Sequence, residues 1–357
     1  MIAKRTAALL VAIVLIGVSI VVRSRVLDDN NAGATPSSAT QRLTCVTELA
    51  AACDAIARTS NGHVRVTVEP AGTTADRLVN AVDATQAVSD GWLTVAPWPD
   101  IVAQRRAQAN RSPLLGPTSS RLARSPLAIA IRNDRFRALK TACPKGVDWT
   151  CLGNQAGKPW GQLGGKVEWG VVRPAHPEPI KSATGLLVLG QAVGAFVATK
   201  DVPVEQVSRG DWQNNAAFAG WFQNLETNVP AEVFVSADPF AQWRQLGGIT
   251  AAAVGGLEAE IGPGLQESGA LRNEATVIYP APVASADVVF APLGPRGNDL
   301  MKIVSSRDAG VALARAGWRV EGQPRAAGIR ATALPTSNGL PPAGTLIALQ
   351  GEWQLVR

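Results

Sequence analysis

Few residues of this chain have the type and spacing that catalysis requires. His63 and His176 are its two histidines, and neither lies near a nucleophile in a recognised pattern. Glu258 and Glu260 are two residues apart, so their side chains point in different directions in either a helix or a strand. The sequence has no G-x-S-x-G elbow, no P-loop and no G-x-G-x-x-G motif after a strand. We therefore expect both histidines at the surface and no enzymatic activity.

Two other segments combine hydroxyl side chains with glycine where a helix is expected to begin. They are residues 70–75 and residues 181–185. Free backbone N–H groups and the helix dipole at such an end favour an anionic or polar group, and Ser and Thr add donors. Each segment alone is typical of an ordinary helix cap, but two of them in separate halves of the chain predict a ligand site. An anion is favoured slightly, and sugar-like and peptide-like ligands remain open.

The four cysteines form two pairs with the spacing C-x7-C. Zinc sites prefer tighter pairs such as C-x2-C, and the chain has only two histidines, so we expect no metal and no cofactor. An even number of cysteines in an exported chain is typical of disulfides. Three pairings are open, and we favour the local one, Cys45 with Cys53 and Cys143 with Cys151.

Export is suggested by residues 6–22, an uncharged apolar run with basic residues on both sides. Seventeen residues reach the short end of what spans a bilayer. The nearest small-x-small cleavage site, residues 32–34, is too distant for easy cleavage, so an uncleaved anchor is favoured over a cleaved signal. We predict a transmembrane signal-anchor at 1–24, a flexible linker at 25–41, and a single-pass cell-membrane protein whose soluble domain is extracytoplasmic.

The formal net charge of the 357 residues is +6, and it is unevenly distributed. Residues 101–140 contain nine basic residues and one acidic residue. Such a stretch attracts anionic lipid, wall polymer or an anionic ligand, but a solvated arginine-rich face is the simpler interpretation and the one we favour. No nucleic-acid motif is present, and we expect no nucleic-acid partner.

From residue 43 onward, segments with strand-like and helix-like patterns alternate. Residues 64–68 and 127–131 are typical of strands, whereas the apolar run after residue 182 is typical of a long helix. Strands are also predicted at 167–172 and 232–236. Alternating strands and helices predict an α/β fold with mainly parallel sheets.

The order of these segments resembles the type II extracellular solute-binding proteins of ABC importers, over most of residues 42–322. Six parts carry the resemblance. These are two strands with ligand-facing turns, a hinge strand, a helix start that grips the ligand, a return crossing and a late helix: residues 43–48, 68–74, 122–131, 179–185, 279–289 and 305–318.

The resemblance implies two α/β lobes, a ligand in the cleft between them and closure about a hinge. Lobe I would comprise residues 42–126 and 276–330, lobe II residues 127–275, and a tail at 331–357 would pack on lobe I. The ligand-binding candidates by position are Thr47, Thr73, Thr74, Trp98, Arg124, Ser125, Lys181, Ser182 and Thr184.

The predicted function is a membrane-tethered solute-binding protein that captures a small polar or anionic ligand, with an ABC permease or another envelope protein as partner. The alternative is a sensor or scaffold of a cell-envelope assembly that uses the same fold without transport. Four tryptophans could stack against a sugar, although core packing is favoured for most of them: Trp98, Trp149, Trp160 and Trp169.

Overall fold

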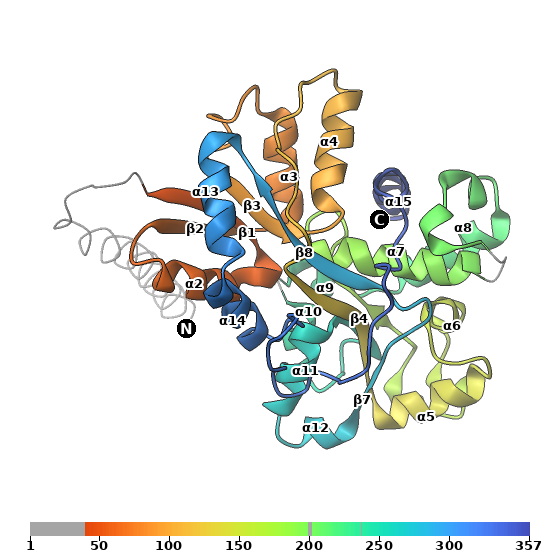
Figure 1. Cartoon of the computed structure of the whole chain (residues 1–357). Coiled ribbons are helices and arrows are strands. Elements are labelled where there is room, and N and C mark those ends of the chain that lie inside the picture. The colour runs from red at the N-terminus through yellow and green to blue at the C-terminus, as the bar shows by residue number, and fades with distance from the viewer. Residues whose placement is uncertain (1–39, 199–201, 237) are drawn as a thin grey trace, which may run out of the picture. The chain divides into compact units, whose positions relative to one another are not determined.

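The computed structural model describes residues 40–198, 202–236 and 238–357 (Figure 1). Residues 41–357 form one compact unit. The predicted anchor and almost all of the predicted linker lie outside the described residues. Within the described ranges, no helix is both long enough and apolar enough to cross a bilayer.

Eight strands form one sheet whose order is β2-β1-β3-β8-β4-β6-β5, with β7 paired to β4. We call β1, β2, β3 and β8 the first strand group, and β5, β6 and β7 the second strand group. Their bounds are β1 Gln41–Val46, β2 Val64–Glu69, β3 Gly91–Val95, β4 Ala123–Arg132, β5 Pro174–Ala175, β6 Ala253–Leu257, β7 Ala275–Ile278 and β8 Ser285–Pro292.

The sheet is mixed, so the prediction of mainly parallel sheets was wrong. β1 is parallel to β2 and to β3, and β5 is parallel to β6, as helical crossovers between strands require. All other pairs are antiparallel: β3 with β8, and β4 with β6, β7 and β8. The cause is that the chain passes between the strand groups twice, out along β4 and back along β8.

β4 links the two strand groups, and residues 127–131 in its second half are wholly apolar. Residues 123–126 pair with β8, whereas residues 127–131 pair with β6. Leu127, Ile129 and Ile131 face the large hydrophobic core, and Ala128 and Ala130 face a second, smaller core. Side chains alternate between the faces of a strand, so a strand buried on both faces needs apolar residues throughout.

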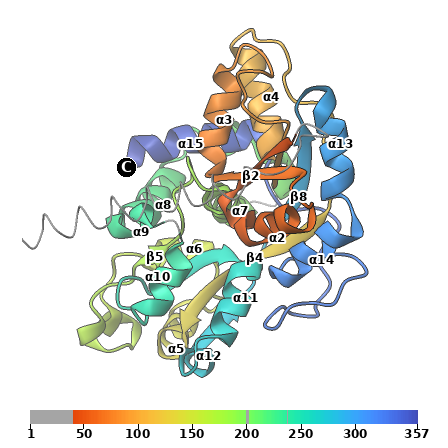
Figure 2. The same cartoon turned by 90° about the vertical axis from the view of Figure 1, so that its left-hand side faces the viewer.

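Helices cover both strand groups. α2, α13 and α4 contact the first group, whereas α5, α10 and α11 contact the second, and α7 contacts both β8 and β6. Figure 2 shows α3 and α4 at one end, α5 and α12 at the other, and β4 between them.

The helices are α2 Ala50–Thr59, α3 Ala71–Asn80, α4 Trp98–Gln108, α5 Asn133–Ala142, α6 Trp149–Gln155, α7 Ala183–Ala198, α8 Ala216–Thr227, α9 Ala231–Val235, α10 Pro239–Gln245, α11 Glu258–Gln266, α12 Leu271–Glu274, α13 Gly294–Val304, α14 Arg307–Arg315 and α15 Ala343–Val356. The short 3-10 turns are η1 Thr47–Leu49, η2 Trp160–Leu163, η3 Val167–Trp169, η4 Val204–Gln206 and η5 Arg209–Asp211.

The C-terminal tail ends in α15, a fourteen-residue helix. It contacts α4, which covers the first strand group, and it also contacts α7 and α8 (Figure 1). Its indole, Trp353, donates a 2.8 Å hydrogen bond to Oε2 of Glu226 on α8. The tail therefore connects helices from both parts of the chain, a wider contact than packing on lobe I alone.

Two local predictions fail and one succeeds. Residues 232–236, predicted as a strand, belong mostly to α9, and residues 167–172 form η3 and a single β-bridge at Val171. Both segments are short apolar runs, which periodicity alone cannot assign to helix or strand. The disulfides join Cys45 to Cys53 and Cys143 to Cys151, as the local pairing predicted.

Candidate functional site

The two segments that sequence analysis selected lie against each other. The N–H of Gly72 donates a 2.9 Å hydrogen bond to the carbonyl oxygen of Lys181. A Cβ atom at position 72 would lie 2.0 Å from the carbonyl oxygen of Ile180, so only glycine permits this approach. The start of α3 and the turn before α7 are thus in direct backbone contact.

α3 begins at Ala71, near the start of the first of these segments. Thr73 and Thr74 therefore lie in its first turn rather than before it. Thr73 is exposed, whereas Thr74 is 1 % exposed and its hydroxyl has no hydrogen-bond partner in the described part of the chain. Of this pair, Thr74 has the unused polar group.

α7 begins at Ala183, and Glu48 of η1 lies at its start. Oε1 of Glu48 accepts hydrogen bonds of 2.9 Å from the hydroxyl of Ser182 and 2.9 Å from the N–H of Thr184. Its Oε2 accepts one of 3.0 Å from the hydroxyl of Thr47. Ser182 also caps the helix by accepting the N–H of Gly185 at 3.1 Å. A carboxylate of the protein itself therefore takes the place that the helix dipole offers to an anion.

A cavity of about 90 Å³ lies beside this junction. Thr47, Glu48, Pro177, Ser182, Thr184, Asp238, Pro239, Phe240, Gly255, Gly256 and Glu260 line it. They come from η1, which follows β1, and from β6, α7, α10 and α11 beside the second strand group. Thr184 is 2 % exposed, and no partner for its hydroxyl exists among the described residues.

The lining of this cavity is acidic. It includes the carboxylates of Glu48, Asp238 and Glu260 and no Lys, Arg or His side chain. Burial raises the pKa of Glu260 well above its ordinary value, and the negative charges of Asp238 and Glu48 raise it further. No group of three or more His, Cys, Asp and Glu residues in the described ranges is arranged to hold a metal ion.

Six of the nine predicted site residues lie outside this lining: Thr73, Thr74, Trp98, Arg124, Ser125 and Lys181. The hydroxyl of Ser125 is fully buried beneath α11, where it accepts the N–H of Ala259 at 3.0 Å. Trp98 is fully buried in the large core. The ammonium of Lys181 is largely exposed and forms a 2.8 Å ion pair with Glu178.

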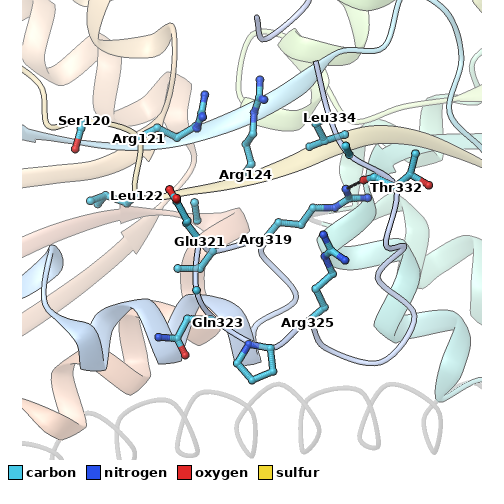
Figure 3. Close-up of a pocket in the computed structure, with 15 residues that line it drawn as sticks. Ser120, Arg121, Leu122, Arg124, Arg319, Glu321, Gln323, Arg325, Thr332 and Leu334 are labelled. Atoms are coloured by element: carbon cyan, nitrogen blue, oxygen red, sulfur yellow. Dashed lines mark hydrogen bonds between the residues drawn. The ribbon is translucent and has the colours of Figure 1, made fainter. Parts of the chain in front are cut away.

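Arg124, another predicted ligand contact, lies in a larger groove of about 910 Å³. Its Nε forms a 2.7 Å ion pair with Oδ1 of Asp287, and its other nitrogens donate to the carbonyl oxygens of Pro335 and Ser337. Figure 3 shows Arg121 and Arg124 extending to the same side of the groove. Arg124 thus fixes β4 to β8 and to the segment that leads into α15.

A second arginine of the groove is equally occupied. Nε and Nη2 of Arg319 lie 2.6 and 2.8 Å from the two carboxylate oxygens of Glu258, and Nη1 donates to the carbonyl oxygen of Thr332 (Figure 3). Such paired, partly buried guanidinium groups stabilise a fold and leave few donors for a ligand. We therefore place the candidate site at the smaller cavity, although the groove is larger.

The expected surface position of His176 is wrong. The imidazole is 1 % exposed, its Nε2 lies 3.1 Å from Oε1 of Glu226, and its Nδ1 lies 2.8 Å from the carbonyl oxygen of Pro177. Three of the four tryptophans considered for sugar stacking are also unavailable, since Trp98, Trp149 and Trp160 are each at most 1 % exposed. Trp169 is only partly buried, and the guanidinium of Arg135 lies over its ring, 3.7 Å from the centroid.

The acidic residues of the cavity were missed by sequence analysis. Glu48 stood next to the candidate Thr47, but an anion-binding hypothesis gives no reason to select a carboxylate. Glu260 was considered only as a partner of Glu258 in catalysis. Asp238 and Phe240 lie at the start of α10, a short helix that no sequence pattern singled out.

The architecture defines the class of fold: it is that of the periplasmic and extracellular solute-binding proteins of ABC transporters, which confirms the resemblance seen in the sequence. The periplasmic binding protein AfuA of Actinobacillus pleuropneumoniae, solved with fructose-6-phosphate, superimposes with a TM-score of 0.56 at 10% identity, covering 90% of this chain and 97% of that one. An extracellular solute-binding protein of Bordetella parapertussis gives 0.53 at 11% identity, covering 88% and 98%.

The Trichodesmium protein IdiA (FutA), solved with iron and citrate, gives a TM-score of 0.51 at 10% identity, covering 89% of this chain and 98% of that chain. No protein-family model and no curated protein matches the sequence. Two of these three neighbours are named as binding proteins, and at such low identity all three establish the fold.

Proposed function

We propose that this chain is a membrane-tethered extracytoplasmic solute-binding protein that holds a small polar ligand between its two lobes. The observation that carries the proposal is the cavity at the junction of η1 and α7, because it combines charged side chains with the unpartnered, buried hydroxyl of Thr184. Leaving a buried polar group without a partner costs free energy, and a ligand that bonds to it removes that cost.

Two further features support a ligand site here. Similar solved proteins of this fold hold small molecules, namely fructose-6-phosphate in one and iron with citrate in another. The cavity is also lined by elements that precede and follow the β4 crossing, so a change in the angle between the strand groups would change its size.

The membrane and transport parts of the proposal rest on the sequence. Residues 6–22 would anchor the chain, and the ligand would pass to an ABC permease in the same membrane. Alkaline extraction of membranes tests the anchor, because a single-pass protein stays with the lipid, whereas a cleaved and released domain appears in the supernatant. Recovery of a fragment that lacks residues 1–24 in the supernatant would contradict the anchor.

A sensor or scaffold is the second candidate, and the contact between Gly72 and Lys181 favours it. The two predicted ligand-binding segments are hydrogen-bonded directly to each other, and α15 contacts helices on both sides of the crossing. Two parts of the chain joined directly in this way suit a protein that holds one conformation and presents a surface to partners.

A ligand screen separates these functions. The Tm of the full chain in mild detergent is measured in the presence of oxyanions, amines, sugars, amino acids and short peptides. A ligand at one hundred times its Kd adds about 2.7 kcal/mol, which shifts the Tm by several degrees. Thr184→Val should remove the shift, whereas Thr141→Val, at an exposed position of α5, should keep it. No shift with any solute would reject the solute-binding function in favour of the scaffold.

A further inference from the structure

We propose that the ligand of the cavity beside Glu48 is a small organic cation with a primary ammonium group. This inference rests on the proposed solute-binding function and replaces the anion that the helix starts favoured. It is carried by three arrangements around the cavity: the charges of its lining, the unused hydroxyl of Thr184, and an aromatic ring.

The charges exclude an anion in the conformation seen here. The positive end of the α7 dipole amounts to about half an elementary charge, and the carboxylate of Glu48 already lies against it. Asp238 adds a second carboxylate, Glu260 adds an acid that an approaching cation can ionise, and no basic side chain lines the cavity. Lys181, which precedes Ser182 in the sequence, is largely exposed and forms an ion pair with Glu178. A cation is attracted to such a lining, and an anion is repelled.

Thr184 provides an independent indication of a ligand site. Its N–H is used by Glu48, but its hydroxyl is buried at the cavity without a partner among the described residues. An ammonium group has three donors, which suits one hydroxyl oxygen and two carboxylates.

Phe240 and the paired glycines set the shape of the cavity. Phe240 is 4 % exposed and lines the cavity, and the face of a phenyl ring attracts a cation. Gly255 and Gly256 of β6 also line the cavity, and there the wall is backbone without side chains. A volume of about 90 Å³ admits a ligand of only a few heavy atoms, such as methylammonium or ethylammonium.

Proton release gives the proposal a second signature. The pKa of Glu260 is raised by burial and by the facing carboxylates of Asp238 and Glu48, and the N–H of Leu257 provides the opposing hydrogen bond. A cation placed among these groups favours the ionised form of Glu260. Binding of the ammonium ion should therefore release a proton, and its affinity should rise with pH.

Isothermal titration calorimetry of the full chain in mild detergent tests the proposal. The probes are methylammonium and ethylammonium chloride, with sodium sulfate, sodium acetate, ethylene glycol and calcium chloride as alternatives at matched ionic strength. We expect binding of an alkylammonium ion, and a heat that differs between phosphate and cacodylate buffers because a proton is released.

Variants connect the binding to this cavity. Glu260→Gln keeps the shape of the side chain but cannot release a proton and become charged when the cation binds. It should weaken binding about tenfold or more and remove the buffer dependence. Thr184→Val should also weaken binding. Glu205→Gln is the matched control, since this carboxylate is exposed on η4, and it should leave the affinity unchanged.

The possible results separate the two proposals. Binding of an anion, a neutral solute or calcium that Thr184→Val abolishes would overturn the ammonium proposal and leave the solute-binding function intact. If both Glu260→Gln and Thr184→Val bind the alkylammonium ion with the affinity of the wild type, the assignment to this cavity is overturned. No binding of any solute would overturn both the ammonium ligand and the solute-binding function.

Discussion

Glu48 and Thr184 are 136 positions apart in the chain, yet Oε1 of Glu48 accepts the N–H of Thr184 at 2.9 Å. The carboxylate comes from the turn after β1, and the amide belongs to the first turn of α7. The same oxygen accepts the hydroxyl of Ser182. This one side chain therefore joins an element beside the first strand group to a helix that contacts the second group.

Removing the carboxylate should weaken this junction. Glu48→Ala leaves the N–H of Thr184 and the hydroxyl of Ser182 without their acceptor, and each loss of a partly buried hydrogen bond to a charged group costs about 1–3 kcal/mol. We expect a lower free energy of unfolding in urea and faster hydrogen exchange of the Thr184 amide.

The matched control is Glu205→Ala. This carboxylate is exposed on η4, so its removal should change the free energy of unfolding by less than about 0.5 kcal/mol. Equal stability of the Glu48→Ala and Glu205→Ala proteins would show that the contact between Glu48 and Thr184 contributes nothing to the fold.

Gly72 should tolerate no side chain. A Cβ there would lie 2.0 Å from the carbonyl oxygen of Ile180, so Gly72→Ala must push the start of α3 away from the turn before α7. Overpacking of this kind costs about 1–3 kcal/mol. Gly220→Ala is the comparison: nothing lies within 4 Å of its Cβ and it sits inside α8, so gain of helix propensity should stabilise the protein by about 0.5–1 kcal/mol. Opposite shifts in Tm are the expected result, and a stable Gly72→Ala protein would contradict the close contact.

The class of fold could be predicted because it depends on the order of the elements. Alternating strand and helix patterns, together with the segments that resemble solute-binding proteins, identified an α/β fold. The direction of β4 and β8 could not be read in this way, because the residues of a strand have the same alternation in parallel and antiparallel pairs. Single-turn segments such as α9 were also beyond the reach of periodicity.

The site shows a different limit. The approach of residues 70–75 to residues 181–185 was indicated by their composition, since hydroxyl and glycine residues are typical of helix starts. The acidic lining of the cavity beside them depends on Glu48 and Glu260, whose carboxylates meet only through tertiary packing. Arg124 illustrates the converse: its charge suggested a ligand contact, and the fold uses it for Asp287.

The buried pair of His176 and Glu226 predicts a dependence of stability on pH. Burial alone would lower the pKa of His176, but the charge and the hydrogen bond of Glu226 outweigh it, so the pKa lies above the ordinary value of 6.5. The folded state therefore binds this proton more tightly than the unfolded state does. The resulting stabilisation is complete below pH 6.5 and is lost as the pH rises through the folded-state pKa.

Melting curves between pH 5 and 9 test this pair through the variant His176→Gln. The difference in Tm between wild type and variant should be largest at the acidic end and should shrink toward the alkaline end. A wild-type advantage that grows with pH would reverse the sign and reject the charged histidine.

Trp353 should be the residue that holds α15 in place. It is 6 % exposed, its Nε1 donates to Glu226 at 2.8 Å, and its ring meets that of Phe234 edge-on with centroids 5.5 Å apart. Trp353→Ala removes both contacts and leaves a cavity, which costs about 3–5 kcal/mol. Trp353→Phe retains a ring and loses only the donor, so about 1–3 kcal/mol is expected. Leu355→Ala on the same helix should be neutral, because Leu355 is 83 % exposed. Urea unfolding of the full chain should rank the variants in that order.

If α15 also restrains the two strand groups, Trp353→Ala will in addition speed hydrogen exchange of the Gly72 amide, which lies far from it in sequence. Unchanged exchange would limit α15 to a local role.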